Sequence, residues 1–166
     1  MVEAEEAARR VKWNERMSLL MHRLTVPNRP QLLEALGRLA IAHTHLERTL
    51  RYTVKTLSGL SGPKSLDPIK RKPISDLRKR IKKRFKKLHP TAAETYRLDE
   101  LLEKTKLLQA ILLEEDLRLG AAPPEAAIER VASEILALGK QINDARLHGF
   151  IHDVVQRHPP NAPPTT

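Results

Sequence analysis

The chain has 166 residues, no cysteine, and a formal net charge of +10 from thirty Lys and Arg against twenty Asp and Glu. This length fits one domain that buries about two thirds of the surface of its unfolded chain. The lack of cysteine excludes disulfide scaffolds, thiolate metal sites and cysteine nucleophiles, and because only 3% of the residues are aromatic, the core must be aliphatic, which favours helices over sheets.

The amino end, MVEAEEAARRVKWNERM, is charged throughout, and no apolar run elsewhere approaches the roughly 18 residues of a membrane span. We therefore expect a soluble, cytoplasmic protein with no signal peptide and no membrane insertion. Apolar residues at helical spacing predict a first helix over residues 3–24: Ala4, Ala7, Val11, Trp13, Met17, Leu20 and Leu24. Two prolines in VPNRP, residues 26–30, end this helix.

The most regular apolar pattern predicts a second helix over residues 30–57. Its stripe consists of Leu32, Leu36, Leu39, His43, Leu46, Leu50, Val54 and Leu57. We interpret His43, which lies among leucines, as a core residue bonded to a polar neighbour. His43 and Glu47 are one turn apart and suit two ligands of a metal ion, but a closed site needs about four ligands and no second pair is evident. We predict no metal site and no cofactor.

Residues 70–87, KRKPISDLRKRIKKRFKK, hold eleven bases and one acid, whereas the other 148 residues hold nineteen of each. The basicity of the chain therefore belongs to one segment. Ile74, Leu77, Ile81, Phe85 and Leu88 follow at steps of three and four, which predicts a helix with one apolar stripe facing a core. Like charges stacked at these spacings cost about a few tenths of a kcal/mol per pair, which favours a polyanion partner over a merely solvated surface.

We predict that the cations of this segment bind the phosphates of a nucleic acid, RNA in preference to DNA. The predicted nucleic-acid-binding residues are Lys70, Arg71, Lys72, Arg78, Lys79, Arg80, Lys82, Lys83, Arg84, Lys86 and Lys87. The exposed face of this helix has no Asn, Gln or aromatic residue to hydrogen-bond or stack with a base, so we expect little sequence preference.

Pro90 ends the basic helix, and Thr91 with Glu94 predicts a capping box for a fourth helix that runs to about residue 119. The last turns of that helix carry three acids that oppose its dipole: Glu114, Glu115 and Asp116. We interpret them as an ionic contact with the basic helix or with a partner, with a carboxylate metal site as the less favoured alternative.

Pro124 opens a last helix whose apolar pattern continues to residue 155, weakened locally by Gly139 and Gly149. The final segment, HPPNAPPTT, is rich in proline and predicts a disordered tail over residues 158–166. Residues 1–157 then form a single domain. We predict an all-α fold, an antiparallel bundle of about five helices joined by short loops.

Two pairs of Arg and His, each separated by four or five residues, are the remaining candidates for a catalytic motif. Arg146 is followed by five residues and then His152, with His148 one turn earlier, and Arg84 is followed by four residues and then His89. The run LLEALGRLAIAHTHLERTLRYTVKTLSG, followed by the basic helix and two long helices, resembles the all-helical HEPN superfamily (higher eukaryotes and prokaryotes nucleotide-binding). That superfamily includes metal-independent ribonucleases, often toxins or defence effectors, whose motif is an Arg, four to six residues, then a His.

The resemblance implies that Arg146 would steady the phosphate and that His152 would serve in proton transfer during attack by a ribose 2′-hydroxyl. Leu147 stands where the family usually has a polar residue, and the fourth helix reads KLLQAILLEED where small relatives show an Arg-Asn pair and a His. We therefore expect a non-catalytic nucleic-acid-binding protein, with a ribonuclease as the alternative. A third interpretation is a helical subunit of a ribonucleoprotein or defence complex, with a protein partner or a second copy of the chain.

Overall fold

The computed structural model describes residues 30–60, 67–113 and 124–160. The predicted first helix, the acids at 114–116 and the tail from residue 161 lie outside these residues. The described helices are α2 (Pro30–Leu57), α3 (Ile74–Lys86), α4 (Ala92–Leu113), α5 (Pro124–Leu147) and α6 (Phe150–Arg157). Within the described ranges there are five helices and no strand, which confirms the predicted all-α bundle.

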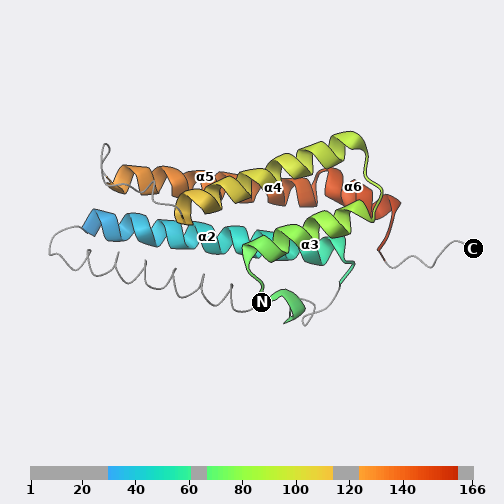
Figure 1. The fold of residues 1–166 in the computed structure, drawn as a ribbon, viewed down its shortest axis with the longest axis horizontal. Coiled ribbons are helices and arrows are strands. Elements are labelled where there is room, and N and C mark those ends of the chain that lie inside the picture. Colours follow the sequence, from blue (N-terminus) through green and yellow to red (C-terminus); the bar gives the residue numbers. More distant parts are fainter. Residues whose placement is uncertain (1–29, 61–66, 114–123, 161–166) are drawn as a thin grey trace, which may run out of the picture.

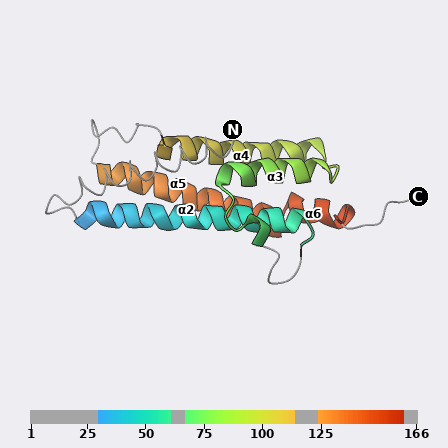
Figure 2. The same cartoon turned by 60° about the horizontal axis from the view of Figure 1, so that its bottom comes forward.

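The helices form two layers (Figure 1). α2 and α5 lie side by side and make the most extensive contact, α3 packs on α2, and α4 packs on α5 and α3. Turning the molecule shows α3 and α4 together over the layer of α2 and α5 (Figure 2). A small apolar cluster of Leu32, Ala35 and Ile128 extends the α2–α5 contact toward the amino ends of both helices.

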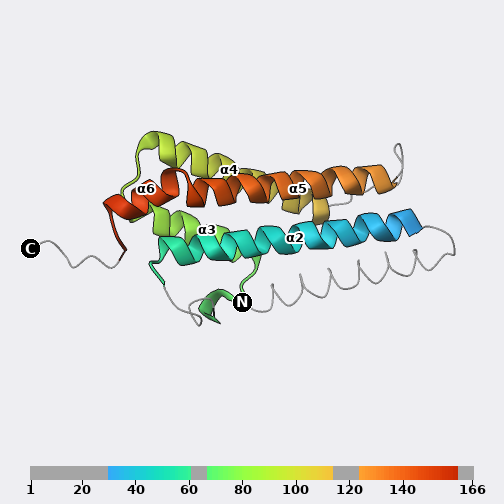
Figure 3. The ribbon, with the colours of Figure 1, turned by 180° about the vertical axis from the view of Figure 1, so that it is seen from behind.

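The directions of the helices differ in part from the predicted antiparallel order. α4 runs opposite to α3 and α5, as short connections require, but α2, α3 and α5 share one direction (Figures 1 and 3). The physical reason is the long connection between α2 and α3, residues 58–73, after which α3 begins beside the middle of α2. The length of the connection, rather than the apolar pattern of the helices, allows α2 and α3 to run in the same direction.

The core lies between the two layers and is mainly aliphatic, as predicted. All five stripe residues of the basic segment are at most 5% exposed: Ile74, Leu77, Ile81, Phe85 and Leu88. They join Leu50 and Leu57 of α2, Leu98 and Leu102 of α4, and Ile135 and Ile142 of α5 in one cluster. Phe85 also meets Phe150 of α6 edge to face, with ring centroids 5.6 Å apart. The basic helix is therefore docked by its apolar stripe.

The predicted last helix is broken into α5 and α6 at Gly149. This residue is the extended N-cap of α6, with φ −122° and ψ −156°. A Cβ atom built on it would lie 3.0 Å from the Cα atom and 3.1 Å from the carbonyl oxygen of Ala145. A side chain at this position would therefore be tight against the backbone of Ala145, which favours glycine. The break brings Phe150, Ile151 and Val154 into the core as a separate short helix.

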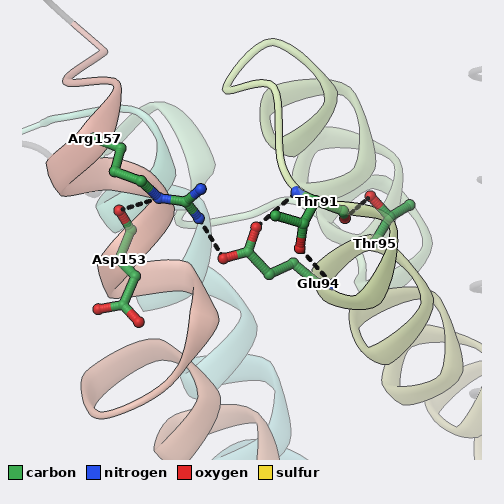
Figure 4. A network of polar contacts seen from close by, with 5 residues as sticks. All are labelled: Thr91, Glu94, Thr95, Asp153 and Arg157. Carbon is green, nitrogen blue, oxygen red and sulfur yellow. Dashed lines mark hydrogen bonds and ion pairs between the residues drawn. The ribbon is translucent and has the colours of Figure 1, made fainter.

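The predicted capping box at the start of α4 is confirmed. The backbone N–H of Thr91 donates to Oε2 of Glu94 over 2.7 Å, and the N–H of Glu94 donates to Oγ1 of Thr91 over 3.2 Å. The guanidinium of Arg157 donates to the other carboxylate oxygen of Glu94 (Figure 4). One carboxylate thus caps α4 and ties it to the end of α6.

Candidate nucleic-acid interface

The predicted phosphate-binding residues divide between α3 and the turn before it. Pro73 is the N-cap of α3, and its carbonyl oxygen accepts hydrogen bonds of 3.1 Å from the N–H groups of Asp76 and Leu77. Three of the predicted residues, Lys70, Arg71 and Lys72, are therefore outside the helix: Lys70 and Arg71 are exposed in a turn that follows the buried Ile69, and Lys72, just before Pro73, is partly buried. The remaining eight cations lie on α3 or at its carboxyl end.

Six of those eight project from the outer side of α3 and are called the outer cations below. They are Lys79, Arg80, Lys83, Arg84, Lys86 and Lys87, and all six are exposed. Among the described residues, no carboxylate forms an ion pair with any of them. They span about 12 Å of helix axis, roughly one charge per 2 Å, which approaches the density of one phosphate per about 1.7 Å along duplex DNA.

Lys82 faces the other way, toward α4. Its Nζ atom lies 3.3 Å from Oδ1 of Asp99 and 3.3 Å from Oε1 of Glu103. Partial burial alone lowers the pKa of Lys82, but the hydrogen bonds to Glu103 and Asp99 raise the pKa overall. The hydrogen bond from Lys82 is also the main cause of a lowered pKa of Glu103, and the charge of Lys106 lowers that pKa further. Lys82 therefore links α3 to α4.

Arg78, one turn before Lys82, is half-buried beside the same helix. Its Nη1 atom is buried and has no hydrogen-bond partner among the described residues. Burial lowers the pKa of Arg78, and the charge of Glu103 opposes that shift. The sequence did not separate Arg78 and Lys82 from the outer cations. A signal for the separation was present, because Asp99 and Glu103 repeat at the same four-residue spacing on α4.

The two residues of the proposed ribonuclease motif have different surroundings. Arg146 is half-buried in the last turn of α5, its Cζ atom lies 5.7 Å from the ring centroid of Tyr52 on α2, and its Nη2 donates to Asn143 over 2.5 Å. His152 is exposed on α6, with its Nε2 atom 2.7 Å from the amide nitrogen of Gln156. Across the described ranges, no hydrogen bond joins Arg146 to His152.

The second Arg–His spacing is likewise divided. Arg84 is one of the outer cations, whereas His89 lies beyond the end of α3 with a positive φ of 47° and is exposed. The His89 ring meets the ring of His158, with centroids 6.0 Å apart. Neither spacing builds a hydrogen-bonded Arg–His pair in the part of the chain that the structure describes.

His43, the other titratable residue singled out in the sequence, is half-buried on α2. Burial lowers its pKa, and the nearby charge of Glu47 acts in the opposite direction. In the described segments, no group of three or more His, Asp or Glu side chains is placed to hold a metal ion. None of the helices in these segments has the length and apolar character needed to cross a membrane.

The strongest candidate site is therefore the row of outer cations on α3. Arg146 and His152 remain predicted catalytic residues that rest on the motif alone. Comparison of the chain with protein-family models, curated proteins and solved structures finds no match, and the resemblance to the HEPN superfamily stays a prediction.

Proposed function

We propose that this protein binds nucleic acid through the outer cations of α3 and catalyses no reaction on it. One observation carries the proposal: six exposed cations lie on a helix that is fixed to the core, and no carboxylate of the described residues neutralises them. A docked helix holds the backbone of these residues in fixed positions, so binding a polyanion orders less of the chain than binding to a flexible tail does.

The chemistry of this surface favours the sugar-phosphate backbone over the bases. Lys and Arg contacts to phosphate fix the position of a nucleic acid but do not read its sequence. The exposed side of α3 presents no Asn, Gln or aromatic side chain to a base edge or a base face. RNA is the proposed ligand in preference to DNA, since a single strand can bend to follow a short row of charges on one face of the protein.

Charge reversal on α3 tests the proposal. The variant carries Arg80→Glu, Lys83→Glu and Lys87→Glu, and filter binding is measured with single-stranded RNA, duplex DNA and anionic vesicles at two salt concentrations. We expect RNA affinity to fall by at least about tenfold, because three attractive contacts become repulsive. Circular dichroism should be unchanged, since all three side chains are exposed. Unchanged RNA affinity contradicts the proposal. Tighter binding to anionic vesicles than to RNA also contradicts it and indicates that the ligand is a lipid surface.

A matched control separates the α3 surface from the overall charge. Lys104→Glu, Arg130→Glu and Lys140→Glu reverse three exposed cations on α4 and α5 and change the net charge by the same amount. Exposed charges more than about 10 Å apart are largely screened at moderate salt, so this variant should bind RNA nearly as well as the native protein. An equal loss of affinity in both variants assigns the attraction to total charge and contradicts an interface on α3.

The same titration distinguishes binding from cleavage. The integrity of the RNA is followed on a denaturing gel, and we expect it to stay intact. RNA cleavage that disappears in His152→Ala replaces this proposal with the ribonuclease alternative.

A further inference from the structure

A second group of cations lies at the contact between α2 and α5, the two helices that run side by side in Figure 3. The guanidinium Cζ atoms of Arg48 and Arg146 lie over the ring of Tyr52, at 5.6 Å and 5.7 Å from its centroid. Arg48 is one helical turn before Tyr52 on α2, and Arg146 comes from the last turn of α5. The fold thus places two guanidinium groups around one aromatic ring.

No acid among the residues that the structure describes balances these two charges. Neither Arg48 nor Arg146 forms an ion pair with a carboxylate in the described part of the chain, whereas Arg51 on the same helix pairs with Glu47 over 3.0 Å. The one side-chain hydrogen bond of Arg146 there goes to the neutral amide oxygen of Asn143. A cation–π contact contributes about 0.5–2 kcal/mol but leaves the positive charge in place.

The Nε atom of Arg146 is buried and has no hydrogen-bond partner among the described residues. A buried donor without an acceptor costs about 1–3 kcal/mol, so the Arg146 guanidinium is incompletely hydrogen-bonded in the fold. Burial also lowers the pKa of Arg146, and the electrostatic effect of Tyr52 opposes that shift without reversing it.

We propose that Arg48, Tyr52 and Arg146 form a binding site for a phosphate group at the seam of α2 and α5, separate from the outer cations. A phosphate offers several acceptor oxygens that match the planar donor fork of a guanidinium, and it neutralises two arginines at once. The Tyr52 ring holds both guanidinium groups in place before the ligand arrives, which reduces the cost of ordering them. His152 has no role in this site.

Inorganic phosphate is the probe, added to the full chain at constant ionic strength while the arginine Nε–Hε and Tyr52 ring resonances are followed by NMR. We expect the Arg146 and Tyr52 signals to shift saturably and those of Arg130, an exposed arginine on α5, to stay in place. Arg48→Gln should weaken binding by at least about tenfold, and Arg146→Lys, which keeps the charge but removes the planar fork, by several-fold. Arg130→Gln is the matched control and should have no effect.

The source of the phosphate group is identified by two further ligands, adenosine monophosphate and a short single-stranded oligoribonucleotide. Both are tested in the Arg80→Glu, Lys83→Glu, Lys87→Glu variant, so that the outer cations do not contribute. Tighter binding of the mononucleotide indicates a free nucleotide, and tighter binding of the oligonucleotide indicates a nucleic-acid backbone. The proposal is overturned if no ligand gives a saturable shift, or if Arg48→Gln and Arg146→Lys both leave the affinity unchanged. Failure of RNA binding on α3 leaves this result unaffected.

Discussion

Two glycines of the last helical region, Gly139 within α5 and Gly149 at the break before α6, are expected to respond oppositely to alanine. At Gly149 the added methyl group would lie 3.0 Å from the backbone of Ala145, so the chain must shift, and Gly149→Ala should destabilise the fold by about 1–3 kcal/mol. At Gly139 no atom lies within 4 Å of the added methyl group, so Gly139→Ala should stabilise α5 by up to about 1 kcal/mol. Urea denaturation checks both. Equal stability of the two variants contradicts the tight break between α5 and α6.

Lys82 and Lys83 are adjacent in sequence but have different surroundings, so the same substitution should separate stability from binding. Lys82 bridges Asp99 and Glu103 and is 39% exposed, so Lys82→Gln should lower the free energy of unfolding by up to about 1 kcal/mol. Lys83 has no ion pair in the described ranges, so Lys83→Gln should leave stability unchanged and cause the larger loss of RNA affinity. Denaturation and filter binding measure the two effects. A larger affinity loss from Lys82→Gln contradicts this division.

At the scale of the helices, the sequence predicts most of what local spacing determines. The apolar stripes predict where α2 and α3 lie, and the capping box predicts where α4 begins. Both signals are local, because they depend on residues only three or four positions apart. The shared direction of α2 and α3 and the break at Gly149 depend on connection length and on a backbone contact with Ala145, which no periodic pattern encodes.

The same distinction applies to the candidate site. The eleven cations are evident in the sequence, but α4 pairs with one of them, Lys82, because of the way the two helices pack together. The contact of Arg146 with Tyr52 joins residues on two helices that are distant in sequence, so it emerges only from the packing of α2 against α5.

The docking of α3 depends on Phe85, which is 2% exposed and meets Phe150 edge to face. Phe85→Ala removes this contact and leaves a cavity, so we expect a loss of about 3–5 kcal/mol in the free energy of unfolding. This is a large share of the roughly 5–15 kcal/mol that stabilises a typical domain. Phe85→Leu fills most of the space and should cost less. Both are measured by thermal denaturation, and a loss below about 1 kcal/mol for Phe85→Ala indicates that α3 is not held by its stripe.

The link between α4 and α6 should depend on pH through Glu94. Burial alone raises the pKa of this carboxyl, but hydrogen bonds from Thr91 and Arg157 lower the pKa overall. Because the folded pKa is below the ordinary value of about 4.5, the ionised group stabilises the fold above that pH, and this contribution is lost as the pH falls further.

The stability difference between the native protein and Glu94→Gln should therefore be largest near neutral pH and shrink below about pH 4.5. Urea denaturation at a series of pH values measures it. Arg157→Gln removes one of the groups that lower the pKa and should weaken the same pH dependence. A difference that does not change with pH contradicts the assigned role of the carboxylate.

Across the whole molecule, the net charge is carried by residues 70–87, while the remainder of the chain is electrically balanced. Ion pairs on the other described helices reflect this balance, for example Arg38 with Glu34 and Glu129, and Lys104 with Glu100. Among the described helices, unpaired positive charge is therefore most concentrated on the exposed side of α3, the arrangement expected for a surface that steers a polyanion. This arrangement makes salt the most direct probe of the proposed function.

Each phosphate contact on a single strand contributes about 0.7 to the slope of log affinity against log salt. If all six outer cations engage RNA, the native protein should give a slope of about −4, and the Arg80→Glu, Lys83→Glu, Lys87→Glu variant a slope no steeper than about −2. The Lys104→Glu, Arg130→Glu, Lys140→Glu control should keep the native slope, because its substitutions lie on α4 and α5. Filter binding over a series of salt concentrations measures all three. Equal slopes in the native protein and the α3 variant contradict the interface. They would mean that Arg80, Lys83 and Lys87 neutralise no phosphate, and so displace no counterions from the RNA, in the native complex.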